Sequence, residues 1–267
     1  MTRVLSGAVL VALAVGVVWL APAWLLFFVA EAIAALAFIE YARLADACGL
    51  PIPKVAAGAA TILGVVGVTS TRWIGDQIAG TAIALDTVLM SAFVVIGALT
   101  LVGWQGGRDA LGRAAAAIFP VLYLGLPIGA LVAIRSREML FLLMLTVMIS
   151  DTAQYYTGRA FGRRLLAPAI SPKKTVEGAI GGFTFGAAIM TVAGAWWLPA
   201  IPIALRALLG IVVVALGITG DLFESMLKRS AGVKDSSGLI PGHGGVLDRI
   251  DALLFAAPIY YLVLKYV

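Results

Sequence analysis

Long apolar stretches recur along the whole chain, and short segments between them carry nearly all of the charge. A helix needs about 20 mostly apolar residues to cross the hydrocarbon core of a bilayer. Nine stretches approach this length, although the third is short; they lie at 4–20, 24–44, 55–69, 83–103, 114–134, 139–156, 179–198, 203–225 and 250–266. The pattern predicts an all-α fold, a polytopic membrane bundle of about nine transmembrane helices.

Two of these stretches allow more than one interpretation. The first, after Arg3, imitates a secretory signal peptide, but it is longer than the 7–15 apolar residues of such a segment and further stretches follow. We expect a retained first helix. Pro127 interrupts the fifth stretch, which is either one kinked helix or a broken or re-entrant pair.

Composition excludes a soluble protein. Apolar residues make up 62% of the chain and charged residues 12%, whereas soluble domains have about 45–50% and about 25%. The lone cysteine, Cys48, excludes an internal disulfide and a cysteine-based zinc site. We predict a single integral membrane domain over 1–267, with scaffold helices in 1–135 and a catalytic region in 136–267.

The Lys and Arg residues predict the orientation. With nine spans, 14 of the 19 fall on the face that holds the N-terminus, and the other face takes Arg72, Arg135, Arg137, Arg206 and Lys265. Cytoplasmic loops carry the excess of positive charge. The N-terminus and the loops after the sixth and eighth spans are therefore predicted to be cytoplasmic, in an inner (plasma) membrane.

Charged and polar residues are concentrated in and next to these two loops. Asp221, Glu224, Ser225 and Lys228 have the spacing of one helix face at the end of the eighth span. Such a stripe is unlike a lipid-facing surface, although a helix end in the headgroup layer with Lys228 paired to Glu224 would also explain it. The loop to residue 251 then mixes cations, glycines and aspartates: Arg229, Lys234, Asp235, Gly242, His243, Gly244, Gly245, Asp248, Arg249 and Asp251.

Carboxylates that hold cations, beside cations that hold phosphates, suit phosphoryl or nucleotidyl transfer. Glycines there let the backbone approach an anion. The loop after the sixth span has the same character, with Asp151, Arg159 and the string SPKKTVEG at 171–178. Lys173 and Lys174 can meet phosphates or anchor at the headgroup layer, and Thr175 can cap the next helix. Glycines at 178, 182 and 186 predict close helix packing.

The stretch 225–251 resembles the signature of phosphatidate cytidylyltransferases, also called CDP-diacylglycerol synthases. It reads S-x-x-K-R, then K-D, H-G-G and D-R-x-D, and the Asp151 and SPKKTVEG segment resembles a second region of that family. Glu40, in FIEYARL, gives a shorter match. The resemblance implies attack by the phosphate of phosphatidic acid on the α-phosphorus of CTP, with pyrophosphate leaving. A phosphate monoester is largely a dianion at pH 7, so no general base is required.

The charge pattern and the resemblance together assign expected roles to individual residues. The expected catalytic residues are Asp221, Asp248, Asp251, Lys228 and Arg249. The expected substrate-binding residues are Arg159, Ser171, Lys173, Lys174, Arg229, Lys234, Asp235, His243, Gly244 and Gly245. The expected ligands of Mg²⁺ are Asp221, Asp248, Asp251, Asp151 and Glu224. The expected partners also include a second cation (K⁺), a second copy of the chain in a homodimer, and the lipid bilayer. No nucleic acid is expected.

Other functions remain open from the residues alone. A CTP-dependent polyisoprenoid kinase would use similar charges. A CDP-alcohol phosphotransferase is disfavoured because its D-x-x-D-G-x-x-A-R string is absent. A cation or lipid transporter could place Asp151 and Asp221 between broken helices, but it would not require the glycine-rich charged loop.

Overall fold

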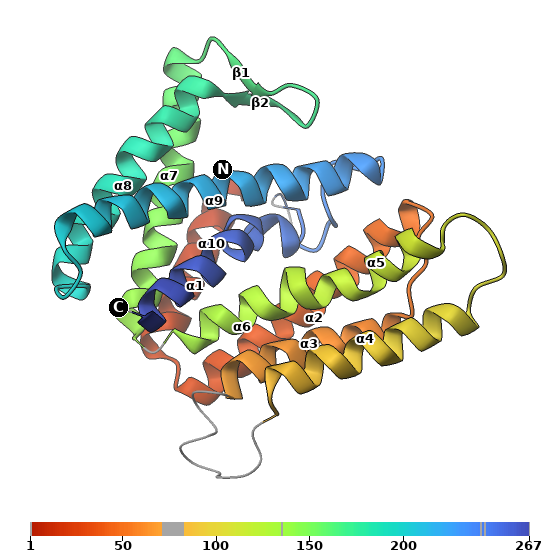
Figure 1. The fold of residues 1–267 in the computed structure, drawn as a ribbon. Coiled ribbons are helices and arrows are strands. Elements are labelled where there is room, and N and C mark those ends of the chain that lie inside the picture. The colour runs from red at the N-terminus through yellow and green to blue at the C-terminus, as the bar shows by residue number, and fades with distance from the viewer. Residues whose placement is uncertain (1, 71–82, 135, 241, 243, 267) are drawn as a thin grey trace. The chain divides into compact units, whose positions relative to one another are not determined.

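The computed structural model describes residues 2–70, 83–134, 136–240, 242 and 244–266. Within them the chain is almost entirely helical, with one small hairpin (Figure 1). The elements are α1 (Thr2–Leu20), α2 (Ala23–Ala47), α3 (Lys54–Ser70), α4 (Leu85–Val102), α5 (Ala110–Pro120), the π-helical turn η1 (Val121–Gly125), α6 (Leu126–Ala133), α7 (Arg137–Phe161), β1 (Leu165–Ala167), β2 (Ser171–Thr175), α8 (Val176–Trp197), α9 (Ile203–Ser230) and α10 (Leu247–Tyr266).

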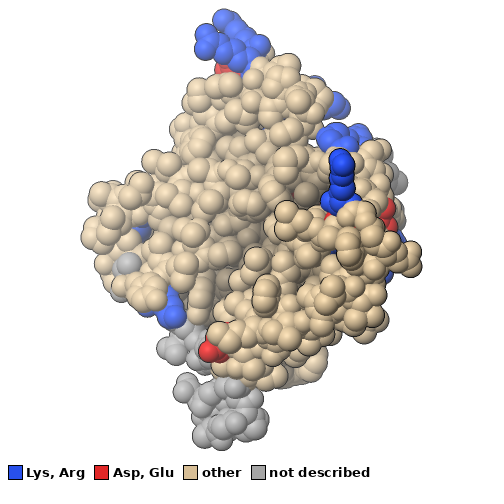
Figure 2. All heavy atoms as spheres, turned by 45° about the vertical axis from the view of Figure 1, so that its right-hand side comes forward, with Lys and Arg blue, Asp and Glu red and all other residues tan. Residues whose placement is uncertain are grey.

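The predicted membrane bundle of helices is confirmed, but its count of nine spans is not. Six helical runs of the described ranges are long and apolar enough to cross a bilayer: α2, α4, α5 to α6, α7, α8 and α9. Val11–Leu20 and α3 are shorter apolar helices. Helix α10 carries three charged residues near its start. On the face drawn in Figure 2, Lys, Arg, Asp and Glu are few and uncharged residues cover most of the surface. The nine-span count and the orientation stay predictions.

The chain divides into two compact units. The first comprises Met1–Ala133 with Ser230–Arg249, and the second comprises Ile134–Arg229 with Ile250–Val267. The glycine-rich signature loop therefore belongs with the N-terminal helices. The sequence had assigned this loop to a C-terminal catalytic region and the N-terminal helices to a scaffold. Those roles stay predictions.

Glycines bring α3 against α6 and η1 in the first unit. A Cβ atom on Gly125 would lie 2.7 Å from the carbonyl oxygen of Thr61, and one on Gly129 would lie 2.8 Å from the Cβ atom of Val68. Both separations are too short for a larger residue. The fifth apolar stretch is one helical run, in which a π-helical turn precedes Pro127. Proline lacks an N–H and disturbs the normal helical ladder, so a π turn here has a local cause.

Helices α7 and α8 pack side by side in the second unit, and the hairpin lies at one end of this pair (Figure 1). The predicted close packing of the glycines in α8 is confirmed. A Cβ atom on Gly178 would lie 2.8 Å from the carbonyl oxygen of Gln154, and Gly182 and Gly186 also lie against α7. Thr175 caps α8 as predicted, since its Oγ1 accepts a hydrogen bond from the Gly178 N–H at 3.1 Å.

The two-stranded hairpin departs from the all-α prediction. Strands β1 and β2 pair antiparallel, with Leu165 opposite Thr175 and Ala167 opposite Ser171. They contain three and five residues, and β2 is mostly polar. Sequence periodicity missed them because such short strands show no alternation of apolar and polar positions.

Candidate active site

Three aspartates from three helices meet in the second unit. Asp151 lies on α7, Asp221 on α9 and Asp251 on α10, and electrostatic repulsion couples the carboxyl group of Asp221 to those of the other two. Helices α9 and α10 approach closely because Gly220 has no side chain: a Cβ atom there would collide with the carbonyl oxygen of Asp251. The fold thus brings into one region acidic residues that are up to 100 positions apart in the sequence. All three belong to the predicted set of metal ligands, and that role stays a prediction.

Lys174 supplies positive charge to this acidic group. Its ammonium group forms an ion pair with Oδ2 of Asp221, and the two side chains are 20% and 35% exposed. Strand β2 carries Lys174, so the unpredicted hairpin delivers this cation to α9. On α7, Gln154 donates a hydrogen bond to Oδ1 of Asp151 at 3.0 Å. Carboxylates and an ammonium group therefore share one partly solvated region.

The polar stripe predicted at the end of α9 makes contacts between consecutive turns. Ser225 Oγ donates to Oδ1 of Asp221 at 3.4 Å, and Lys228 forms an ion pair with Glu224. The Glu224 side chain is fully buried and that of Lys228 is 10% exposed. This pairing is what the headgroup-layer interpretation expected. The metal role of Glu224 and the catalytic role of Lys228 stay predictions.

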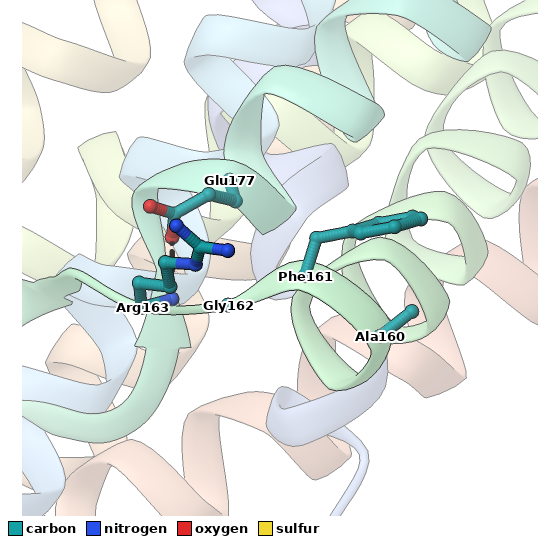
Figure 3. A pocket seen from close by; sticks show the side chains of 5 residues that line it. All are labelled: Ala160, Phe161, Gly162, Arg163 and Glu177. Atoms are coloured by element: carbon teal, nitrogen blue, oxygen red, sulfur yellow. Dashed lines mark hydrogen bonds between the residues drawn. The ribbon is translucent and has the colours of Figure 1, made fainter.

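A shallow pocket of about 330 Å³ lies where α7 meets the start of α8. Its lining comprises Ala160, Phe161, Gly162, Arg163 and Glu177 (Figure 3). Glu177 Oε2 accepts hydrogen bonds from the backbone N–H of Arg163 at 2.9 Å and of Arg164 at 3.2 Å. Glu177 thereby fixes the chain where it leaves α7. Both arginine side chains are exposed there.

In the first unit, Asp248 organises the glycine-rich loop. Its Oδ2 accepts three hydrogen bonds: from the Ser236 N–H at 3.0 Å, from Ser236 Oγ at 2.7 Å and from the Gly245 N–H at 2.7 Å. Asp248 was predicted as a metal ligand and catalytic residue. The structure gives one of its oxygens a structural task, and its role toward a metal stays a prediction.

Glu40 is the functional candidate to which sequence reasoning gave no role. It lies on α2 with 2% of its surface exposed. Four donors of the loop lie within hydrogen-bond distance of its carboxylate: Ser236 Oγ, which is shared with Asp248, Ser237 Oγ and the N–H groups of Val246 and Leu247. The sequence did contain one signal for such a role: Glu40 is a carboxylate within an apolar span, and such residues usually have a function.

The two adjacent glycines of the loop are required by these carboxylates. Gly244 has a φ of 81°, and a Cβ atom on it would lie 2.6 Å from Oδ2 of Asp248. A Cβ atom on Gly245 would overlap Ser236 Oγ and the carboxylate of Glu40. The sequence predicted that these glycines admit an anion closely. The anions they meet in the structure are the protein's own, and contact with a substrate phosphate stays a prediction.

The remaining predicted binding residues are mostly exposed: Arg159, Lys173, Arg229, Lys234, Asp235 and Arg249. Arg229 Nε donates to the carbonyl oxygen of Ile170 at 3.4 Å, which links α9 to the hairpin. Ser171 is partly buried at the start of β2. His243 lies outside the described residues. Their roles in phosphate binding stay predictions.

Oxygen ligands suit magnesium, and the aspartates of the second unit offer only oxygen. Among the described residues no three acidic, His or Cys side chains form a group that could hold a metal by themselves. Mg²⁺ is usually held by one or two carboxylates together with substrate phosphates and water. Asp221 and Asp251 fit that requirement in donor type and number.

Comparison with known proteins agrees with the signature. The chain matches the cytidylyltransferase family over residues 1–267. The chain belongs to the cytidylyltransferase family. The resemblance predicted from residues 151–178 and 225–251 is therefore confirmed at the level of the family.

Individual relatives of this cytidylyltransferase are named phosphatidate cytidylyltransferase. The protein of Aquifex aeolicus is 40% identical over 148 residues, which are 55% of each chain. That of Pseudomonas aeruginosa is 37% identical over 196 residues, or 70% of each chain. That of Staphylococcus saprophyticus is 31% identical over 217 residues, or 80% of each chain.

Proposed function

We propose that this membrane protein transfers the cytidylyl group of CTP to phosphatidic acid, giving CDP-diacylglycerol and pyrophosphate for phospholipid biosynthesis. The observation that carries the proposal is the acidic group of Asp151, Asp221 and Asp251 with Lys174 paired to Asp221. It combines cation-holding and phosphate-holding groups in a chain whose relatives are named for this reaction.

The attack on CTP does not require a general base. The phosphate of phosphatidic acid is largely dianionic at neutral pH and can attack the α-phosphorus directly. The main barrier is repulsion between two polyanions, so fixed positive charge supplies most of the rate. Lys174 and the exposed Lys173 attract and orient the phosphates. In the second unit Asp221 and Asp251 would hold Mg²⁺, which neutralises phosphate charge when bound.

The nature of the labelled product tests this function. With CTP and phosphatidic acid, we expect label on the α-phosphate to enter a chloroform-soluble product and label on the γ-phosphate to appear as pyrophosphate. Thin-layer chromatography of both phases measures this, and omission of phosphatidic acid is the control. Transfer of the γ-label to lipid, with release of CDP, would instead establish a lipid kinase.

We further propose that the site faces the cytoplasm of a bacterial inner membrane and that the enzyme is a homodimer. The 14 to 5 distribution of Lys and Arg supports the orientation, and the family resemblance supports the dimer. Bacterial relatives support a bacterial membrane.

Cysteine labelling tests the orientation. In a Cys48→Ala background, single cysteines replacing Lys173 and Val233 should both react with a membrane-impermeant maleimide only in inside-out vesicles. A cysteine added after Val267 should react only in right-side-out vesicles. Both native side chains are exposed, so access is not limited by burial. Labelling of 173 and 233 from opposite faces would contradict the nine-span topology.

A further inference from the structure

We propose that Glu40 is a positioning residue that clamps the two ends of the glycine-rich loop, residues 236–237 and 246–247, and through them holds Asp248 in place. The residue lies in the N-terminal helices, outside both signature segments. Its effect on turnover rests on the proposed function, whereas its effect on the loop does not.

The hydrogen bonds of Glu40 are divided evenly between its two oxygens. Oε1 accepts from Ser237 Oγ at 2.6 Å and from the Val246 N–H at 3.0 Å. Oε2 accepts from Ser236 Oγ at 2.9 Å and from the Leu247 N–H at 2.8 Å. Each oxygen therefore joins the beginning of the loop to its end. Within the loop, one antiparallel backbone bridge joins Ile240 and Gly244, and the Glu40 carboxylate adds the connection between the two ends of the loop.

Burial makes the clamp specific for a carboxylate. Glu40 is 2% exposed, and a buried charge is tolerated only where hydrogen bonds or an opposite charge compensate it. Four donors meet it here, two of them backbone N–H groups that cannot turn away. A neutral amide presents one NH₂ group in place of an acceptor, so one of those N–H groups would face a donor.

Ser236 connects the clamp to Asp248. Its hydroxyl lies 2.9 Å from Oε2 of Glu40 and 2.7 Å from Oδ2 of Asp248. One hydroxyl proton can serve only one of these oxygens at a time, so the position of the hydroxyl depends on both carboxylates. Gly245 fits between them because it has no side chain. Displacement of Glu40 is therefore transmitted to Asp248 through Ser236 and through the backbone of Leu247, which immediately precedes Asp248.

Hydrogen exchange measures the clamp without reference to catalysis. In Glu40→Gln, amides of the loop peptide covering 236–247 should exchange about 5- to 30-fold faster than in the unmodified protein. Exchange in α3 and α4 should stay unchanged. Glu31→Gln is the matched control, because Glu31 lies on the same helix and its carboxyl oxygens have no hydrogen-bond partner among the described residues. It should leave the loop unaffected.

Kinetics then separate positioning from general stability. Per folded molecule, kcat should fall about 10- to 100-fold in Glu40→Gln, as expected for lost hydrogen bonds to a charged group. It should fall further in Glu40→Ala, while the melting temperature in detergent changes by only a few degrees. A merely structural residue would lower the melting temperature and leave kcat per folded molecule unchanged, and that result would overturn the proposal.

Ser237→Ala provides a second test should the Glu40 variants not fold. It removes one donor to Oε1 from a partly buried position and should accelerate exchange of the loop by a smaller factor. Unchanged loop exchange in Ser237→Ala and in any folded Glu40 variant would overturn the clamp. If loop exchange accelerates but no cytidylyl product forms from the unmodified protein, the clamp stands and the proposed reaction falls.

Discussion

Asp221→Asn will lower turnover by about two to three orders of magnitude, the scale on which one preorganised active-site group acts. The change keeps the size of the side chain and removes the charge that would hold a divalent ion. It also leaves Lys174 without its ionic partner. Initial rates measured over a range of Mg²⁺ concentrations should show little rescue by excess metal, and EDTA should abolish the activity of the unmodified enzyme.

Two comparisons make the result for Asp221 specific. Asp86→Asn, an exposed aspartate in the first turn of α4, should retain normal turnover. Lys173→Ala, which is exposed on the same hairpin as Lys174, should raise KM for CTP or phosphatidic acid with nearly unchanged metal dependence, because lysines also hold ground-state phosphates. Near-normal turnover of folded Asp221→Asn would show that this carboxylate holds no essential metal.

Gly245→Ala should strongly damage the signature loop. A Cβ atom at this position overlaps Ser236 Oγ and the carboxylate of Glu40, so the loop must move and the hydrogen bonds to Asp248 must lengthen. We expect a loss of about 1–3 kcal/mol in stability, typical of overpacking. Turnover per folded molecule should fall at least about 100-fold, since several hydrogen bonds to charged groups are disturbed together.

The same loop provides the control for this substitution. Gly238→Ala adds a methyl group where no atom lies within 4 Å, and its backbone is not in the left-handed region. It should be nearly neutral in turnover and in thermal melting of the detergent-solubilised protein. Equal activity of the two alanine variants would mean that close packing of Gly245 on the two carboxylates has no functional consequence.

Several features of the site followed from the sequence because they depend on neighbours within one or two helical turns. The apolar stretches, the Thr175 cap, the close-packed glycines of α8 and the polar face at the end of α9 are of this kind. In each, the spacing of residue types is enough to predict the contact. The signature segments also identified the family, since they combine many residue types at defined spacings.

Only the tertiary structure decided which distant charges meet. Lys174 reaches Asp221 because it lies on a short hairpin that the periodicity of the sequence does not reveal. Glu40 reaches the signature loop across about 200 positions of sequence. Nothing in the local pattern of either segment encodes the other, because such contacts depend on how helices pack. The sequence by itself therefore determined a membrane-embedded cytidylyltransferase, and packing decided that an N-terminal carboxylate holds its glycine-rich loop.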